Sequence, residues 1–192
     1  RDELHPWVNP DHQELMAAVA DPVTALQGYC AALTGVDRGL QALLATLDAN
    51  ADAAASTYVI FMSDNGFSTG HHGYWGKGNG TLPLNAWDPS VLVPFVVRGP
   101  GVAAGRVDTS AVSALSLHPT ILELAGVPVP PGLEPSLTGV LLGTAAEHPA
   151  VVEDVHDEYG GLRMVKSGAA KLVDRRFRQQ PVAEIESGIS GG

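Results

Sequence analysis

The chain has 192 residues, 45% of them hydrophobic, which suffices for one globular domain with its own core and is too short for two full-sized domains. Its 11 Lys and Arg are outnumbered by 21 Asp and Glu, giving a formal net charge of −10. This balance argues against nucleic acid or an anionic membrane as a partner, and no uncharged apolar run reaches the roughly 18 residues of a membrane span.

The N-terminal residues predict a loop over 1–10, and they contain no apolar stretch of the kind found in a secretory signal peptide. Asn9 and Asp21 each precede a proline, the pattern expected of a helix N-cap followed by a first-turn proline. The chain begins with Arg1 rather than Met, and we therefore expect it to be part of a longer protein.

An amphipathic helix is predicted from Pro22 to Leu47, because most apolar residues there are three, four or seven positions apart. These residues are Val23, Leu26, Cys30, Leu33, Leu40, Leu43, Leu44 and Leu47. We expect the stripe to pack against a core and Cys30, the single cysteine, to be a buried structural thiol. Residues 51–56 are predicted to be a linker.

Two apolar runs, 57–62 and 91–98, are typical of strands buried on both faces, as in a parallel sheet covered by helices. Residues 119–125 predict a short helix, with Pro119 in its first turn and Gly126 at its C-terminal end. A long helix, buried strands and a second helix in this order indicate an α/β fold.

Three short segments follow a proline-rich connection over residues 127–136. They cover residues 151–153, 162–165 and 171–173, and their turn-separated spacing predicts a small antiparallel sheet. Residues 179–192 show no pattern.

Residues 64–77 contain the densest group of chemically active side chains, directly after the first predicted strand. Open α/β sheets bind their ligands at this end of a strand. The four glycines of the segment allow close approach of the backbone to a ligand, although a plain glycine-rich surface loop fits the composition equally well.

Two enzymatic interpretations of this segment fit poorly. Residues 66–70 match G-x-S-x-G around Ser68, but that motif needs a strand running directly into it and a helix directly after it. A zinc site from Asp64, His71 and His72 would have adjacent histidines, which point in different directions on most backbones, and no further His or Cys at ligand spacing.

A site for a hard cation is the third interpretation. Asp64 and Asn65 offer side-chain oxygens, which suit Ca²⁺ or Mg²⁺, and Lys77 would supply positive charge for an anionic substrate. An ordinary turn at Asn65–Gly66 explains the same residues without a ligand, and composition leaves the choice between these two open.

Five stretches, in order along the chain, resemble the C-terminal part of sulfatases of the alkaline phosphatase superfamily. They are the helix residues 29–40, the strand ending in Ser63-Asp64-Asn65-Gly66, the segment GHHGYWGK over 70–77, VPFVVRGPG over 93–101 and PTILELAG over 119–126. The resemblance covers about residues 25 to 175. It implies an alkaline-phosphatase-like mixed or parallel sheet flanked by helices, present here in part, with a small C-terminal antiparallel sheet.

The resemblance also implies roles for four residues. Asp64 and Asn65 correspond to ligands of a catalytic divalent ion, which is Ca²⁺ in most sulfatases, ahead of Mg²⁺ or Mn²⁺. Lys77 corresponds to a sulfate contact that stabilises charge on the leaving group. His72 matches the motif histidine and is the second candidate for the catalytic set, with a supporting role favoured because Gly73 and Trp75 predict a packed loop.

The family's nucleophile, a formylglycine made from Cys or Ser in C/S-x-P-S-R, has no counterpart here. Pro-Ser occurs at 89–90 and 135–136, but neither has the Cys or Ser two residues before it nor the Arg after it. We therefore expect a fragment of a sulfuric-ester hydrolase that is inactive by itself, with a small-molecule or carbohydrate sulfate ester as the parent's substrate.

Two alternatives remain: a phosphonate or phosphodiester hydrolase of the same superfamily, and a non-catalytic remnant domain. The expected division of the chain is 1–135, the C-terminal part of the sulfatase α/β domain, and 136–192, an incomplete C-terminal subdomain.

Overall fold

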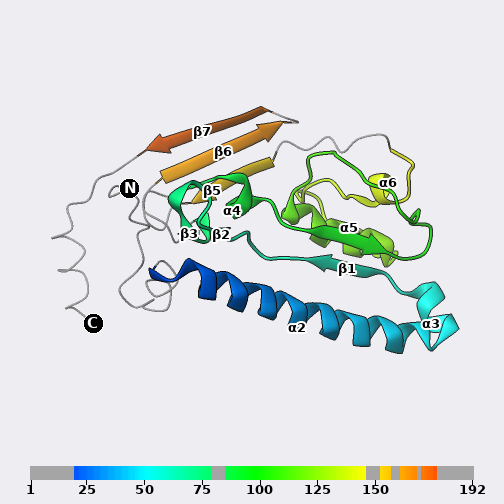
Figure 1. The fold of residues 1–192 in the computed structure, drawn as a ribbon. Coiled ribbons are helices and arrows are strands. Elements are labelled where there is room, and N and C mark those ends of the chain that lie inside the picture. Colours follow the sequence, from blue (N-terminus) through cyan, green and yellow to red (C-terminus); the bar gives the residue numbers. More distant parts are fainter. Residues whose placement is uncertain (1–19, 79–84, 146–151, 157–160, 168–169, 177–192) are drawn as a thin grey trace, which may run out of the picture.

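A computed structural model describes residues 20–78, 85–145, 152–156, 161–167 and 170–176 (Figure 1). The predicted loop over 1–10, the cap at Asn9 and the tail 179–192 lie outside these residues. The elements in chain order are α2 (Pro22–Asp48), α3 (Ala51–Ser56), β1 (Val59–Met62), β2 (Ser68–Thr69), the 3-10 turn η1 (His71–Gly73), β3 (Trp75–Gly76), α4 (Asp88–Val91), β4 (Phe95–Arg98), the 3-10 turn η3 (Ala114–Ser116), α5 (Leu117–Leu124), α6 (Thr138–Leu141), β5 (Val152–His156), β6 (Gly161–Ser167) and β7 (Ala170–Arg176).

The described strands form three antiparallel groups. β1 pairs with β4, β2 pairs with β3, and β5, β6 and β7 form one sheet in that order. The mixed α/β composition and the small C-terminal antiparallel sheet are confirmed, but the two apolar runs do not pair as parallel strands. An apolar run indicates burial on both faces and carries no information on strand direction, so the pairing could not be predicted from it.

The second apolar run is also shorter than predicted. Its first residue, Val91, belongs to α4, whose first turn contains Pro89, and β4 begins only at Phe95. Pro94 has no N–H for the β1 ladder, so the strand starts after it. Gly126 has φ 69° after α5, as expected of a residue that ends a helix in the left-handed region.

Helix α2 begins where the sequence predicts, since the Asp21 carboxylate accepts a hydrogen bond from the Thr24 N–H at 3.2 Å. The expectation that its apolar stripe is packed against a core is wrong for this structure, because α2 has no buried residue. Cys30, predicted to be buried, is exposed. Amphipathic spacing identifies the face that is suited to burial, but another element must be present to cover it.

Residues 51–56 are helical rather than a linker. The Asn50 side chain accepts a hydrogen bond from the Ala53 N–H at 3.1 Å and so caps α3. The alanines of this segment favour a helix once such a cap is present. Asp48, at the end of α2, forms an ion pair with Arg98 of β4. Among the described residues, no helix is both long enough and apolar enough to cross a membrane.

The segment from α5 to α6 is well packed. The Thr120 hydroxyl donates to the Ser116 carbonyl at 2.6 Å and accepts from the Leu137 N–H at 2.8 Å, with all three residues fully or almost fully buried. Leu137 is 2% exposed. One buried hydroxyl thus joins the two helices and leaves none of these polar groups unpaired.

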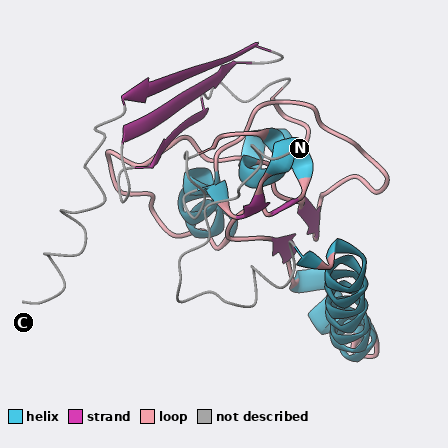
Figure 2. Ribbon diagram, turned by 60° about the vertical axis from the view of Figure 1, so that its left-hand side comes forward, coloured by secondary structure: helices cyan, strands magenta, loops and turns pink. Residues whose placement is uncertain are grey.

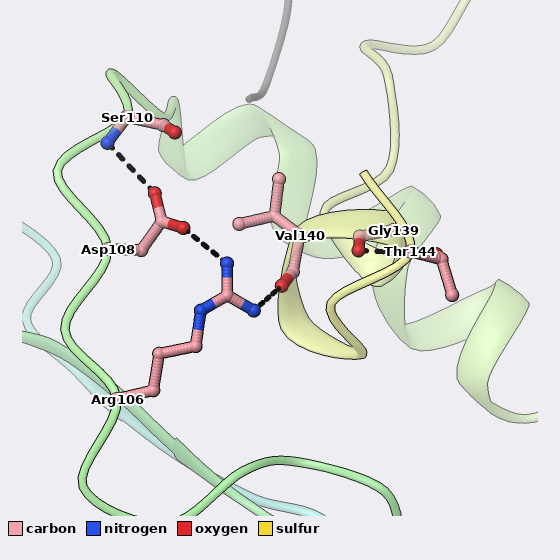
Figure 3. A network of polar contacts seen from close by, with 6 residues as sticks. All are labelled: Arg106, Asp108, Ser110, Gly139, Val140 and Thr144. Atoms are coloured by element: carbon pink, nitrogen blue, oxygen red, sulfur yellow. Dashed lines mark hydrogen bonds and ion pairs between the residues drawn. The ribbon is translucent and has the colours of Figure 1, made fainter. Parts of the chain in front are cut away.

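An arginine holds the loop after β4 against α6 (Figure 3). Arg106 donates to the Val140 carbonyl at 2.6 Å and forms an ion pair with Asp108 at 2.6 Å. The Ser110 hydrogen bonds, of the side chain and then of the backbone N–H, together with Arg106, lower the pKa of Asp108 below its ordinary value.

The C-terminal sheet packs against the region of α4. Met164 of β6 is 1% exposed and lies against Ala86, with Val91 and Val173 beside them. Lys171 of β7 donates to the Ala86 carbonyl at 2.8 Å and pairs with Asp88. These contacts hold the C-terminal sheet to α4, beside the loop that follows β1.

Candidate functional site

The loop after β1 presents its two predicted ligands to solvent. Asp64 and Asn65 are both exposed. The Ser63 hydroxyl donates to the Asn65 carbonyl at 2.8 Å, and the Asn65 side-chain NH₂ donates to the Gly66 carbonyl at 2.9 Å. With its amide nitrogen used in this way, the Asn65 side chain can offer its oxygen to a ligand.

Gly66 anchors this loop on α4. Its N–H donates to the Ser90 carbonyl at 3.2 Å, and a Cβ at this position would lie 2.3 Å from the Pro89 carbonyl oxygen. No side chain fits in that space, so a glycine is required for the close approach of the two backbones. The residue that the sequence marks as a turn is therefore also a packing contact.

A buried pair of hydroxyls reinforces the same junction. The Ser68 and Ser90 oxygens are 2.9 Å apart, and the two residues are 0% and 5% exposed. In this environment Ser68 is a structural residue rather than an accessible nucleophile, and the segment after it forms the 3-10 turn η1 and β3 instead of the helix that the G-x-S-x-G motif requires.

The short β2–β3 hairpin brings Lys77 back toward the loop. Ser68 pairs with Gly76 and Thr69 with Trp75, so the next position of the register sets Lys77 across from Phe67. Lys77 is exposed, whereas Trp75 beneath the hairpin is 8% exposed. The hairpin therefore returns a cation to the end of β2 that adjoins Asp64 and Asn65.

His72 lies at the tip of this hairpin in a conformation that is rare for a residue with a side chain. Its φ is 53° and it is the non-glycine residue of the described chain with positive φ. Its ring stacks on Trp87 with centroids 3.9 Å apart and planes at 17°. Strained backbone of this kind is concentrated at functional sites, and Trp87 gives the imidazole a fixed orientation.

The described residues contain no group of three His, Cys, Asp or Glu that could hold a metal ion. The zinc hypothesis on Asp64, His71 and His72 therefore has no geometric support; His71 instead accepts a hydrogen bond from the Thr69 N–H at 3.3 Å. Asp64 and Asn65 have the oxygen chemistry of a Ca²⁺ or Mg²⁺ site, but two side chains are fewer than the six to eight oxygens that Ca²⁺ typically takes.

Sequence reasoning missed the role of α4 at this site. Neither Ser90 nor Trp87 is predicted by the sequence as a partner of Ser68 or His72, although Asp88–Pro89 is a recognisable helix start. Their contacts cross more than a dozen residues of sequence, and such a pairing has no periodic signal in the chain.

Comparison with known proteins gives a match to the Sulfatase family model over residues 2–127. Similar curated proteins include Sulfatase ppz1 of Metarhizium majus, 40% identical over 98 residues, which are 50% of this chain and 22% of that protein. The Arylsulfatase of Volvox carteri is 39% identical over 118 residues, 59% of this chain and 17% of that protein. Human Arylsulfatase K is 33% identical over 82 residues, 43% of this chain and 14% of that protein. The matched segments thus span less than a quarter of these relatives.

Proposed function

The chain belongs to the sulfatase family, and from this membership we propose that it forms part of a hydrolase of sulfuric esters. The observation that supports the proposal most is the loop after β1: an exposed Asp64–Asn65 pair, anchored on α4 through Gly66, with Lys77 returned beside it by the β2–β3 hairpin. Curated relatives are named as sulfatases and arylsulfatases.

Sulfatases use a divalent metal, and we propose Ca²⁺ with Asp64 and Asn65 as two of its ligands. Bound there, the cation would supply positive charge against the sulfate oxygens. Because these two side chains provide only part of a coordination shell, the remaining oxygens must come from outside the described residues. The formylglycine nucleophile is likewise assigned to a segment that these residues do not contain.

Lys77 is proposed to contact the sulfate group. A lysine ammonium is a compact point charge, and an anionic ester that is cleaved develops further negative charge on its leaving oxygen. A fixed cation beside that oxygen favours the transition state over the ground state. His72, held by Trp87, is proposed as a positioning residue of the hairpin that carries Lys77.

The proposal is tested in a chimera in which residues 20–127 replace the equivalent segment of the Metarhizium majus Sulfatase ppz1. Hydrolysis of p-nitrophenyl sulfate is compared with that of p-nitrophenyl phosphate and a phosphonate ester. We expect the sulfate to be preferred, Lys77→Ala to lower kcat by about 10²–10³-fold, and Asp64→Asn to lower it while Asp52→Asn, an exposed acid on α3, leaves it unchanged.

Two results would contradict the proposal. A preference for the phosphate or phosphonate ester would indicate the other hydrolases of the superfamily, and hydrolysis of simple carboxylic esters abolished by Ser68→Ala would restore the serine hypothesis. For the chain by itself, titration with CaCl₂ followed by calorimetry should give a Kd weaker than about 1 mM, because two side-chain ligands make an incomplete site.

A further inference from the structure

The apolar seam of α2 is periodic over the whole helix. Alternate steps of three and four residues lead along it through Val23, Leu26, Cys30, Leu33, Asp37, Leu40, Leu44 and Leu47. Seven of these eight positions are apolar, which is the 3-4 spacing of a helix that packs lengthwise against another element. Such a seam supplies most of the stability of a protein helix when it is covered.

Only the C-terminal half of this seam is covered. Leu40, Leu44 and Leu47 are half-buried, and a shallow groove runs between this end of α2 and the start of β1, lined in part by Leu47 and Val59. Toward the N-terminal end the side chains lie open: Val23 is 65% exposed and Leu33 50%. Figure 1 shows α2 extending past β1, and Figure 2, which looks nearly along α2, shows it at the edge of the molecule.

The uncovered half of the seam adjoins the candidate site. Tyr29 stacks on Phe67 with ring centroids 6.2 Å apart, and Phe67 directly follows the Asp64–Gly66 loop. Leu26 and Leu33, three positions before and four after Tyr29, lie on the same face of the helix as that tyrosine. Whatever covers them therefore lies alongside the loop that carries Asp64 and Asn65.

Strand β1 has an open edge on this side of the fold. Within the described residues it pairs with β4 alone, and its four apolar residues are all only half-buried. An apolar strand with a free edge is suited to receive a further strand. The seam and this edge together form one surface, which we call the α2–β1 face.

A second copy of the chain fits this face poorly. The net charge of −10 opposes self-association, and a symmetric pairing of two seams would bring Asp37 of each copy into the contact. The C-terminal half of the seam is also occupied by the chain's own β1. A different occupant is indicated by the comparisons, since the matched segments cover 22% or less of the relatives.

We propose that the α2–β1 face docks the part of a sulfatase domain that the relatives contain and these residues lack. This inference rests on the proposed function, because it assigns the partner that completes the same site. Docking covers the open half of the seam, adds backbone pairing at β1, and sets the missing oxygen ligands beside Asp64 and Asn65.

Cys30 allows the proposal to be tested on the unmodified chain, because it is exposed, lies on the open half of the seam and is the single cysteine. The chain is co-expressed with the part of the Metarhizium majus Sulfatase ppz1 that precedes its matched region, and the complex is isolated by size exclusion. The rate of Cys30 alkylation by N-ethylmaleimide is then followed by mass spectrometry of this chain. We expect a one-to-one complex and at least a ~10-fold slower alkylation than in the chain alone.

Matched variants localise the contact. Leu26→Lys and Leu33→Lys change side chains that are 39% and 50% exposed, so the thermal midpoint of the isolated chain should change little while the complex is lost. Leu172→Lys, at a side chain 72% exposed on β7, is the control. Figures 1 and 2 both show β7 on the side of the molecule opposite α2, and this variant should retain the complex.

Three outcomes would overturn the proposal: no complex with the ppz1 segment, a complex with unchanged Cys30 alkylation, or a homodimer of the chain that protects Cys30. None of these readouts depends on sulfate hydrolysis. A complex that protects Cys30, forms equally with Asp64→Asn and fails to cleave p-nitrophenyl sulfate would instead support the docking and contradict the proposed function.

Discussion

Two helical regions with similar amphipathic spacing differ sharply in burial. In α5 and α6, Pro119, Thr120 and Val140 are buried, and Leu137 directly before α6 is 2% exposed. In the 27 residues of α2 no side chain is buried. Apolar periodicity therefore marks a face that is suited to packing in both regions, but only the first region finds its partner within the described part of the chain.

The two regions also differ in how polar groups are used. Around α6, Thr120 and Arg106 make hydrogen bonds that join segments distant in sequence. Around α2, the Asp48–Arg98 ion pair is formed between side chains that are each 49% exposed. Exposed ion pairs contribute little to stability, so the α2 region is held mainly by whatever covers its apolar face.

The largest expected difference between the regions is in the cost of truncating a leucine. Leu137→Ala should lower the free energy of unfolding by about 2–5 kcal/mol, because it leaves a cavity in a buried site. Leu33→Ala, 50% exposed on α2, should change it by less than about 0.5 kcal/mol. Urea unfolding followed by circular dichroism measures both, and equal losses would show that α2 is packed in solution.

Glycine-to-alanine changes should have opposite signs in the two regions. Gly66→Ala should destabilise by about 1–3 kcal/mol, since its Cβ would meet the Pro89 carbonyl oxygen and force the loop off α4. Gly28→Ala, with nothing within 4 Å of its Cβ on α2, should stabilise by about 0.5–1 kcal/mol through helix propensity. Thermal midpoints of the two variants provide the measurement, and a neutral Gly66→Ala would contradict the close approach.

The buried hydroxyl pair should show coupling. Ser90→Ala leaves the Ser68 oxygen without its 2.9 Å partner in a buried position, which is expected to lower stability by about 1–3 kcal/mol. The double variant Ser68→Ala/Ser90→Ala should lose less than the sum of the single variants, because no orphaned hydroxyl remains. Urea unfolding of all four proteins gives the coupling; strict additivity would argue against the hydrogen bond.

The smallest expected effect is a dependence of stability on pH. Hydrogen bonds from Ser110, and then Arg106, lower the pKa of Asp108, and the Arg98 hydrogen bond lowers that of Asp48. A carboxyl whose pKa is lower in the folded state contributes stability above its unfolded pKa of about 3.9, and the contribution disappears as the pH falls through the folded value. Asp108→Asn should therefore lower the melting temperature at pH 7 and reduce its drop below pH 4.

Asp48→Asn should act in the same direction, with an effect that declines at high salt because the pair with Arg98 is exposed. Melting curves from pH 7 to acid, at low and high NaCl concentration, distinguish the two carboxylates. An acid limb that is unchanged in both variants would show that neither interaction contributes to stability in solution.

Local signals in the sequence identified several features correctly. The Asp21 cap, helix α5 with Gly126 after it, and the three strands of the C-terminal sheet all depend on residues adjacent in the chain or on short periodicities. The order of motifs along the chain likewise indicates the sulfatase family, and the family match over residues 2–127 confirms it.

Tertiary structure alone decided strand direction, the exposure of Cys30, the helix at 51–56 and the anchoring of the Asp64–Asn65 loop on α4. Burial on both faces looks the same for parallel and antiparallel strands, and an amphipathic helix has the same sequence whether or not its apolar face is covered. Propensity and spacing act over a few residues, whereas these features depend on free energies of contact between segments far apart in the chain.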